Sequence, residues 1–358
     1  MHWKSTINIA GTKIGITDPT YFIADIAANH DGEFERAKAL IHLAKAAGAD
    51  CAKFQHFLPN KIVSQKGFDS LKTNMAHQSK WDKSVVDIYD QYHFRRDWTV
   101  PLKDECAKVG IDFMTTPYDF EALEEVAPMV PALKIGSGDV SWHNFIEEVA
   151  KLGEPVLLAT GAADMEDSAQ AVAAVLKHNP NIVLMQCNTN YTGSLENFRY
   201  VNLNVLKAFA VRYPNMVLGL SDHTPGHSAV LGAVALGARV IEKHFTDDND
   251  RAGPDHSFAL NPVTWRAMVD ATRELEYALG DGVKRLEGNE AETIIVQRRA
   301  IRLKADLPSG HVLCADDLEC LRPCPAEAID PRHWNALLGR ALGAAKEAGD
   351  HIIWSDLV

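Results

Sequence analysis

The feature that most limits the fold of this chain is an alternation that repeats from residue 21 to about residue 280. A short apolar run is followed by a polar loop and then by a stretch with helical spacing that ends at a glycine. This alternation predicts parallel strands joined by crossover helices, and eight such units in about 260 residues suit a closed (β/α)8 TIM barrel. The predicted strands span residues 21–27, 50–55, 111–115, 132–136, 155–160, 181–186, 216–220 and 239–243.

Two helical patterns and one hairpin agree with a barrel. Apolar residues between positions 34 and 47 recur every three to four residues, and Gly48 stands at the expected helix stop. Asn261 and Pro262 form the cap and first turn of the last helix, which Gly280 ends. Residues 7–9 and 13–16 flank a Gly-Thr turn and predict a small hairpin that closes the bottom of the barrel.

The chain changes character after the barrel. Residues 281–293 are polar, contain two glycines and break the helical periodicity. Beyond them, strand-like runs at 300–303 and 352–354 are separated by turn signals such as the Leu-Pro-Ser-Gly of residues 307–310. We therefore predict a hairpin and barrel domain over residues 1–282, a linker over 283–293 and a compact β-rich domain over 294–358.

Charge and composition exclude several classes of partner. The formal net charge of −12 argues against nucleic acid, which is bound mainly through Lys and Arg. The first ten residues hold no apolar run of signal-peptide length, and no later stretch approaches about 18 uninterrupted apolar residues. Six cysteines occur without metal-ribbon spacing in a chain too long to need disulfides. We expect a cytoplasmic protein with reduced thiols and no membrane association.

Polar side chains end nearly every predicted strand. The active site of a (β/α)8 barrel lies at the carboxyl ends of the strands, so these residues should converge on one rim. In chain order they are Asp25, Asn29, His30, Lys53, Gln55, Thr115, Thr116, Lys134, Ser137, Asp139, Thr160, Asn188, Thr189, Tyr191, Ser221, Asp222, His223, Glu242 and His244.

Two histidines predict a divalent metal. His223 and His244 end the seventh and eighth predicted strands, whose tops are neighbours in a closed barrel. Glu242 and Asp255 are close by in sequence to complete or tune the site. With two nitrogen ligands and no thiolate, the other positions would go to water and substrate, as in a catalytic ion.

Two lysines predict an anion site. Lys53 and Lys134 lie in strands that are otherwise too apolar for unpaired ammonium groups, so they should face an anion in the barrel mouth. Ser137 and Ser221 could add hydroxyl donors, which suits a phosphate or a carboxylate. The alternative is a pair of internal salt bridges with Asp25 and Asp139.

At these motifs the chain resembles the sialic acid (N-acetylneuraminate) synthase family over essentially its whole length. The matching segments are residues 24–32 (ADIAANHDG), 53–55 (KFQ), 115–117 (TTP), 134–138 (KIGSG), 219–224 (GLSDHT), 242–246 (EKHFT) and 253–255 (GPD). Residues 298–299, 307–310 and 321–323 are similar to the family's antifreeze-like (SAF, β-clip) domain.

The resemblance implies an enzyme that condenses phosphoenolpyruvate with an N-acyl-mannosamine-type aldehyde sugar. His223 and His244 would hold Mn²⁺, or else Mg²⁺ or Co²⁺. A domain-swapped homodimer would bring Arg322 near the N-acyl group of the sugar in the partner's barrel. The implied phosphoenolpyruvate ligands are Lys53, Thr116, Lys134, Ser137, Asn188, Thr189 and Ser221. The implied sugar contacts are Gln55, Tyr191, Glu242 and Arg322.

Three departures from the family concern candidate site residues. Asp25 and Asp139 stand where most relatives have Glu, and Thr189, with Asn188 beside it, replaces an asparagine that normally touches phosphoenolpyruvate. We expect Asp25 to bind sugar hydroxyls or water and to shuttle a proton, with Asp139 and Asp255 assisting. The acceptor could be N-acetylmannosamine or a diacetamido-trideoxy hexose, which would give a legionaminic- or pseudaminic-type acid.

Three further expectations stay open. Residues 56–80 could form a lid over the sugar pocket or a plain excursion. Another phosphoenolpyruvate-dependent synthase of a 3-deoxy sugar acid would use a phosphorylated aldose and need further basic residues. A non-catalytic carbohydrate- or ice-binding protein would have no use for the converging lysines, histidines and carboxylates.

Overall fold

The computed structural model describes residues 2–71 and 83–358 and divides the chain into two compact units, Met1–Gly280 and Asp281–Val358. In the first unit all eight predicted strands are present as a closed parallel barrel in the order β10-β3-β4-β5-β6-β7-β8-β9. The strands are β3 (Tyr21–Asp25), β4 (Cys51–His56), β5 (Asp112–Pro117), β6 (Leu133–Ile135), β7 (Val156–Ala159), β8 (Ile182–Cys187), β9 (Val217–Asp222) and β10 (Ala238–His244).

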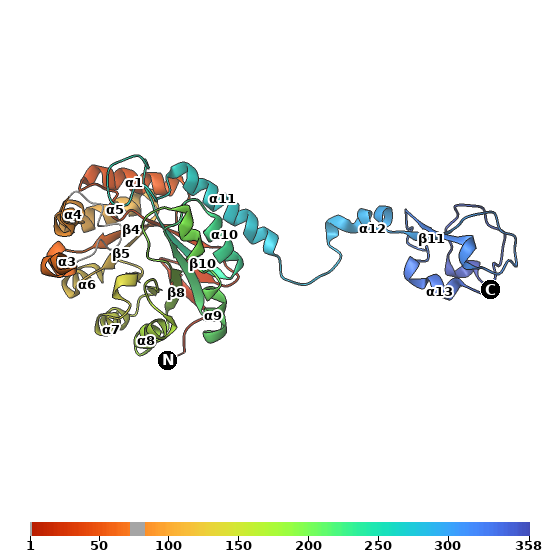
Figure 1. Ribbon diagram of the computed structural model, residues 1–358, viewed down its shortest axis with the longest axis horizontal. Helices are drawn as coiled ribbons and strands as arrows, with labels where there is room; N and C mark the ends of the chain where they lie inside the picture. The colour runs from red at the N-terminus through yellow and green to blue at the C-terminus, as the bar shows by residue number, and fades with distance from the viewer. Residues whose placement is uncertain (1, 72–82) are drawn as a thin grey trace. The chain divides into compact units, whose positions relative to one another are not determined.

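Helices surround the strands (Figure 1). The apolar stripe predicted from residue 34 is the buried face of α1, and Asn261 caps α11 through the main-chain N–H groups of Val263 and Thr264. Three short helices, α2 (Pro59–Ile62), α3 (Gln65–Ser70) and α4 (Val85–Tyr92), precede α5. The helices that cover the barrel are α1 (Phe34–Ala46), α5 (Thr99–Val109), α6 (Phe120–Val126), α7 (His143–Lys151), α8 (Met165–Leu176), α9 (Val205–Arg212), α10 (Ser228–Ala235) and α11 (Pro262–Leu279).

The barrel interior is apolar at its lower end. The expected hairpin consists of β1 (Thr6–Ile9) and β2 (Thr12–Gly15), paired antiparallel. Its buried residues Ile7, Ile9 and Ile14 join one cluster with the inward-facing residues at the starts of the barrel strands, among them Tyr21 and Cys51. The hairpin therefore closes the lower end of the barrel, and the upper end is left for polar side chains.

The second unit has its own apolar core, which includes Ile301, Leu318 and Leu357. The predicted strand at 300–303 is β11 (Ala300–Leu303), which pairs with β12 (Leu318–Leu321), a strand that the sequence did not indicate. The predicted strand at 352–354 is wrong, because His351 makes a single bridge to Arg302 and a 3-10 turn begins at Trp354. The remaining helical segments are α12 (Ala291–Gln297), α13 (Trp334–Leu337) and the 3-10 turns at Gly288–Glu290, Ala315–Asp317, Pro331–His333 and Trp354–Asp356.

No helix in the described residues is long and apolar enough to span a membrane.

Candidate active site

A cavity of about 450 Å³ opens at the carboxyl ends of the barrel strands. Nearly all predicted site residues of the barrel line this cavity, which is consistent with the expected convergence on one rim. Those lining it are Asp25, Lys53, Gln55, Thr116, Lys134, Ser137, Asp139, Thr189, Tyr191, Ser221, His223, Glu242, His244 and Asp255.

The two-residue period of the strands places these side chains. Successive residues of a strand point to opposite faces, so Ile23 in the apolar lower layer is followed on the same face by Asp25, and Cys51 by Lys53 and Gln55. The parallel register aligns Asp25 with Lys53 on β4 and with His244 on β10. The carboxylate of Asp25 therefore lies between the ammonium group of Lys53 and the imidazole of His244.

Both lysines are buried in ion pairs at the floor of the cavity. Lys53 Nζ lies 2.7 Å from Asp25 Oδ2 and 3.7 Å from Glu242 Oε1, and Lys134 Nζ lies 2.6 Å from Glu242 Oε1. The alternative of internal salt bridges is thus right for Lys53 with Asp25. For Lys134 the partner is Glu242 and not Asp139, because Glu242 comes from β10 across the interior of the barrel.

The charges of this cluster stabilise one another. Burial alone would raise the pKa of Glu242, but Lys134 and Lys53 lower the pKa below its usual range. Burial likewise opposes the charge of Lys53, and the neighbouring carboxylates Asp25 and Glu242 outweigh that effect and raise its pKa. Glu242 Oε2 is buried without a hydrogen-bond partner in the described structure. This oxygen can accept a hydrogen bond from a ligand.

Asp25 is held by three donors. Its Oδ1 accepts a hydrogen bond from the main-chain N–H of Ala27, and its Oδ2 accepts from Lys53 Nζ and, at 3.1 Å, from Gln55 Nε2. The carboxylate is almost completely buried. His244 Nε2 is 3.9 Å from Asp25 Oδ2.

The two predicted metal ligands are neighbours. The ring centroids of His223 and His244 are 5.4 Å apart, and Tyr191 packs on both rings. His223 Nδ1 lies 3.1 Å from the main-chain oxygen of Asn188, to which it can only donate, so Nε2 is the nitrogen that a metal ion would use. Asn188 therefore positions His223 through its carbonyl, and it is not among the residues that line the cavity.

His244 has carboxylates near both nitrogens. Its Nδ1 is 3.5 Å from Asp255 Oδ2, too long for a hydrogen bond, and this buried nitrogen has no hydrogen-bond partner in the described residues. Burial by itself would lower the pKa of His244, but Asp255 and Asp25 together raise it. A buried nitrogen that makes no hydrogen bond in the described residues and lies beside a second imidazole fits a divalent ion with two protein nitrogens as ligands. Among the described residues no cluster of three or more His, Cys, Asp or Glu side chains has metal-site geometry.

The Asp139 carboxyl group has a pKa that suits proton exchange near neutral pH. It ends the 3-10 turn Ser137–Asp139 that follows β6, and it lines the cavity. Burial raises its pKa from 3.8 to about 6. A group with this pKa can both give and take a proton near neutral pH.

A glycine lets two further predicted residues approach one another. A Cβ atom on Gly161 would lie 2.0 Å from Thr189 Oγ1 and 2.8 Å from Ser137 Oγ. The main-chain N–H of Gly161 donates to Ser137 Oγ at 3.0 Å. Only glycine leaves both hydroxyl groups in the cavity wall.

Sequence reasoning missed an apolar part of the lining. Phe57 follows β4, Ile62 ends α2, and Ile88, Tyr89 and Tyr92 belong to α4. Their signal in the sequence is weak, because isolated apolar residues in short helices usually belong to a core. Phe57 and Ile62 lie in the segment 56–80 considered as a lid, whereas residues 72–80 of that segment lie outside the described residues. Tyr118, which follows β5, also lines the cavity unpredicted.

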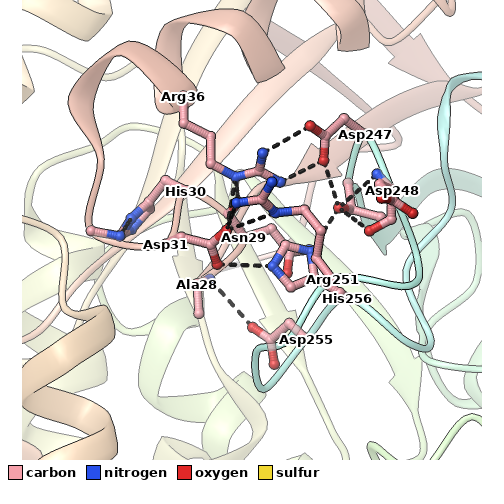
Figure 2. A network of polar contacts seen from close by, with 12 residues as sticks. Ala28, Asn29, His30, Asp31, Arg36, Asp247, Asp248, Arg251, Asp255 and His256 are labelled. Atoms are coloured by element: carbon pink, nitrogen blue, oxygen red, sulfur yellow. Dashed lines mark hydrogen bonds and ion pairs between the residues drawn. The ribbon is translucent and has the colours of Figure 1, made fainter.

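A polar network fastens the loop that carries Asp255 to the start of α1 (Figure 2). Arg251 Nη2 lies 2.9 Å from Asp31 Oδ2, and His256 Nε2 lies 2.9 Å from Asp31 Oδ1. Arg36 binds Asp31 at 3.0 Å and Asp247 with both terminal nitrogens. Asp31 thus contacts the side chains of Arg36, Arg251 and His256.

The network ends at the candidate metal site. His256 is completely buried, and its Nδ1 lies 2.7 Å from Thr246 Oγ1. Next to His256, Asp255 Oδ2 accepts a 3.3 Å hydrogen bond from the main-chain N–H of Ala28 and faces His244. The loop from residue 247 to residue 258 is therefore fixed from both sides.

Arg322 belongs to the second unit. It is exposed, and its Nε donates a 2.6 Å hydrogen bond to the main-chain oxygen of Gln297.

Comparison with known proteins identifies two families along the chain. The model of the NeuB family matches residues 40–284, and that of the SAF domain matches residues 298–358. The N,N'-diacetyllegionaminic acid synthase of Campylobacter jejuni is 31% identical over 90% of this chain and 95% of its own length. Human N-acetylneuraminate-9-phosphate synthase is 32% identical over 86% of this chain and 84% of its own length.

A solved structure agrees with these relatives. N-acetylneuraminic acid synthetase from Leptospira borgpetersenii, crystallised with citrate, superposes with a TM-score of 0.70 at 28% identity and covers 82% of this chain and 96% of its own. The fold is therefore shared with this solved structure.

Proposed function

The chain belongs to the NeuB family, and from this premise we propose that it is a sialic-acid-type synthase. It joins C3 of phosphoenolpyruvate to the aldehyde carbon of an N-acyl amino sugar, takes up one water and releases inorganic phosphate. The observation that carries the proposal is one cavity lined by two buried lysines and two adjacent histidines. Relatives at 31% to 32% identity are named as synthases of N,N'-diacetyllegionaminic acid, N-acetylneuraminate 9-phosphate and pseudaminic acid, which supports the proposal.

The lysines provide for the anionic substrate. Phosphoenolpyruvate carries a carboxylate and a phosphate, and Lys53 and Lys134 would neutralise these groups at the floor of the cavity. Ser137, Thr189 and Ser221 add hydroxyl groups, and Glu242 stays ionised between the lysines. Holding both reactants in one cavity can lower the barrier by about 7–11 kcal/mol through positioning.

His223 and His244 would hold a divalent ion, for which Mn²⁺ is our first choice. Such an ion supplies Lewis-acid polarisation of the aldehyde oxygen. The chain's own residues then handle protons and water. Asp139, with its raised pKa, would exchange a proton with the new hydroxyl group or with the incoming water. Asp25 orients Lys53 and Gln55 through hydrogen bonds, and Asp255 lies within ion-pair distance of His244.

We further propose a cytoplasmic homodimer in which Arg322 reaches the sugar bound by the partner. Apolar side chains at the end of α11 and beyond it, Tyr277, Val283 and Leu286, are exposed in the single chain and would be covered in a dimer. Light scattering of the purified protein measures the oligomeric state.

Arg322→Ala should raise KM for the sugar much more than KM for phosphoenolpyruvate, and an equal rise in both would contradict this placement.

The decisive experiment is phosphate release from phosphoenolpyruvate. Release in the presence of Mn²⁺ should require an N-acyl amino sugar, and mass spectrometry should find the condensed acid. His223→Ala and His244→Ala should abolish turnover and weaken Mn²⁺ binding in calorimetry while circular dichroism stays unchanged. Full activity of the metal-stripped protein would contradict the metal assignment, and release without any acceptor would contradict the condensation.

A further inference from the structure

Two charged residues directly precede the two histidines of the candidate metal site. Asp222 ends β9 and comes before His223, and Lys243 comes before His244 at the end of β10. Successive strand residues point to opposite faces, so both histidines line the cavity while Asp222 and Lys243 point to the helix side of the barrel. The strand-end pattern predicted Asp222 on the rim, but its side chain lies on the other face of the strand.

The surroundings of this pair are apolar. Leu220 and Ile241, which point to the same side two residues earlier, belong to the core between the strands and the covering helices. Asp222 and Lys243 are almost completely buried. The parallel register places them opposite one another, with Lys243 Nζ 2.5 Å from Asp222 Oδ2. A buried ion pair in an apolar layer adds little net stability, because desolvation of both groups offsets their attraction.

Hydrogen bonds connect the pair to the main chain around His223. Lys243 Nζ donates to the main-chain oxygen of Thr224 at 2.6 Å. Asp222 Oδ1 accepts from the main-chain N–H of Thr224 at 3.1 Å, and Thr224 Oγ1 donates to Asp222 Oδ2 at 2.8 Å. The residue enclosed by these contacts is His223. The pair therefore holds the main chain on both sides of His223 and ties it to the strand that carries His244.

From this geometry we propose that Asp222 and Lys243, together with Thr224, are positioning residues that keep the two histidines at the separation needed to share one divalent ion. The inference rests on the proposed function and names groups that act through the metal ligands without touching metal or substrate. Imidazoles from two strands can bind one ion only while the strand ends and the following turn keep their places. Apolar side chains could fill the same space but could not make directional contacts to Thr224.

The first test replaces the pair by apolar residues. Asp222→Leu/Lys243→Met should keep the free energy of unfolding in urea near that of the wild type, because no buried charge is left alone. Calorimetric titration of Mn²⁺ into the metal-free full-length protein should nevertheless show an affinity lower by at least about tenfold, as is usual when the groups behind a metal ligand are removed. Unchanged Mn²⁺ affinity in this folded variant overturns the inference.

Tyr21→Phe is the control for the loss of a buried polar contact. Tyr21 is buried at the lower end of the barrel, and its hydroxyl donates to Asp112 Oδ2 at 2.5 Å. Its loss should lower the free energy of unfolding and leave Mn²⁺ affinity unchanged. If this variant lowers the affinity as much as the double variant does, affinity follows general stability and the inference is overturned.

Thr224→Val provides the test should circular dichroism show the double variant unfolded. It keeps the ion pair and removes the hydroxyl group that binds Asp222. We expect Mn²⁺ affinity to fall by about threefold, since one hydrogen bond that fixes the turn after His223 is lost. An unchanged affinity overturns the inference here as well.

The inference and the proposed function fail in different ways. If the wild type binds no Mn²⁺, or if His223→Ala and His244→Ala bind it as tightly as the wild type, the metal assignment is overturned together with the inference. If the wild type binds Mn²⁺ through these histidines and releases phosphate with an N-acyl amino sugar, tight Mn²⁺ binding by the folded positioning variants overturns the positioning role alone.

Discussion

At the scale of single residues, the site depends on charges that are buried in pairs. Lys53, Lys134, Asp25 and Glu242 occupy the floor of a barrel that is otherwise apolar below them. An isolated charge at this depth would be strongly unfavourable, whereas here each charged group lies within ion-pair distance of an opposite one. Stability and the proposed binding of phosphoenolpyruvate therefore depend on the same side chains.

Removal of one partner of a buried ion pair should lower the free energy of unfolding. Lys134→Met leaves Glu242 buried with Lys53 at 3.7 Å as its remaining cation, and we expect unfolding free energy to fall by about 3 kcal/mol in urea titrations. Lys151→Met removes a lysine from an exposed pair with Glu148 and should cost less than about 1 kcal/mol. The double variant Lys134→Met/Glu242→Gln should recover part of the loss, and no recovery would contradict the pairing.

Asp139 should give the protein a characteristic pH dependence. Its pKa is raised from 3.8 to about 6 by burial, so the folded state favours the protonated acid. That contribution to stability is complete below pH 4 and is lost as the pH rises to about 6. The stability of the wild type relative to Asp139→Asn should therefore fall by up to about 3 kcal/mol across this window. Urea titrations at several pH values measure the difference, and the exposed Asp104→Asn variant should show no such trend.

Residue types predicted the polar half of the site but not the apolar half. Lys53, His223 and His244 are conspicuous because each lies in or directly after an apolar strand, where a charged or polar side chain is unfavourable without a partner. Ile62 and Ile88 have no such contrast with their neighbours. The partner of Lys134 also could not be predicted, because Glu242 is more than a hundred residues away and reaches it only through closure of the barrel.

At the scale of elements, the strands were predictable and the second unit less so. The eight barrel strands are buried runs between helices, and all eight occur where the alternation predicts them, with ends that shift by one or two residues. The β-rich unit is held by isolated bridges and short turns, such as the bridges at Leu307 and Val312. Patterns this short have no periodicity that could distinguish β12 from a loop.

The loop of residues 247–258 is an element fixed by side chains. Asp31→Ala removes the carboxylate that binds Arg36, Arg251 and His256, so the loop should loosen and Asp255 should lose its place beside His244. We expect faster amide hydrogen exchange across residues 247–258 and at least about tenfold lower kcat, with KM for phosphoenolpyruvate nearly unchanged. The exposed control Asp270→Ala, which removes a partner of Arg266, should change neither. Unchanged exchange in the loop would contradict this role of the network.

At the scale of the whole molecule, two separate cores predict two independently compact parts. The core of the barrel unit and that of the second unit share no residue, and positions 281–289 between them are exposed. Trypsin under native conditions should therefore cut first at Lys284 or Arg285 and leave two folded fragments. The double variant Lys284→Gln/Arg285→Gln should resist this cut. Early cleavage inside the barrel would contradict the separation.

The hairpin at the bottom of the barrel has a consequence for the order of events in turnover. Because β1 and β2 fill the lower end, molecules enter and leave through the upper mouth, and the lysines lie deepest. A sugar seated at the mouth would obstruct the way to Lys53 and Lys134. Phosphoenolpyruvate should consequently bind first and the sugar second, so that the sugar traps its co-substrate. Isotope-trapping experiments should recover bound phosphoenolpyruvate, but not sugar bound alone, as product.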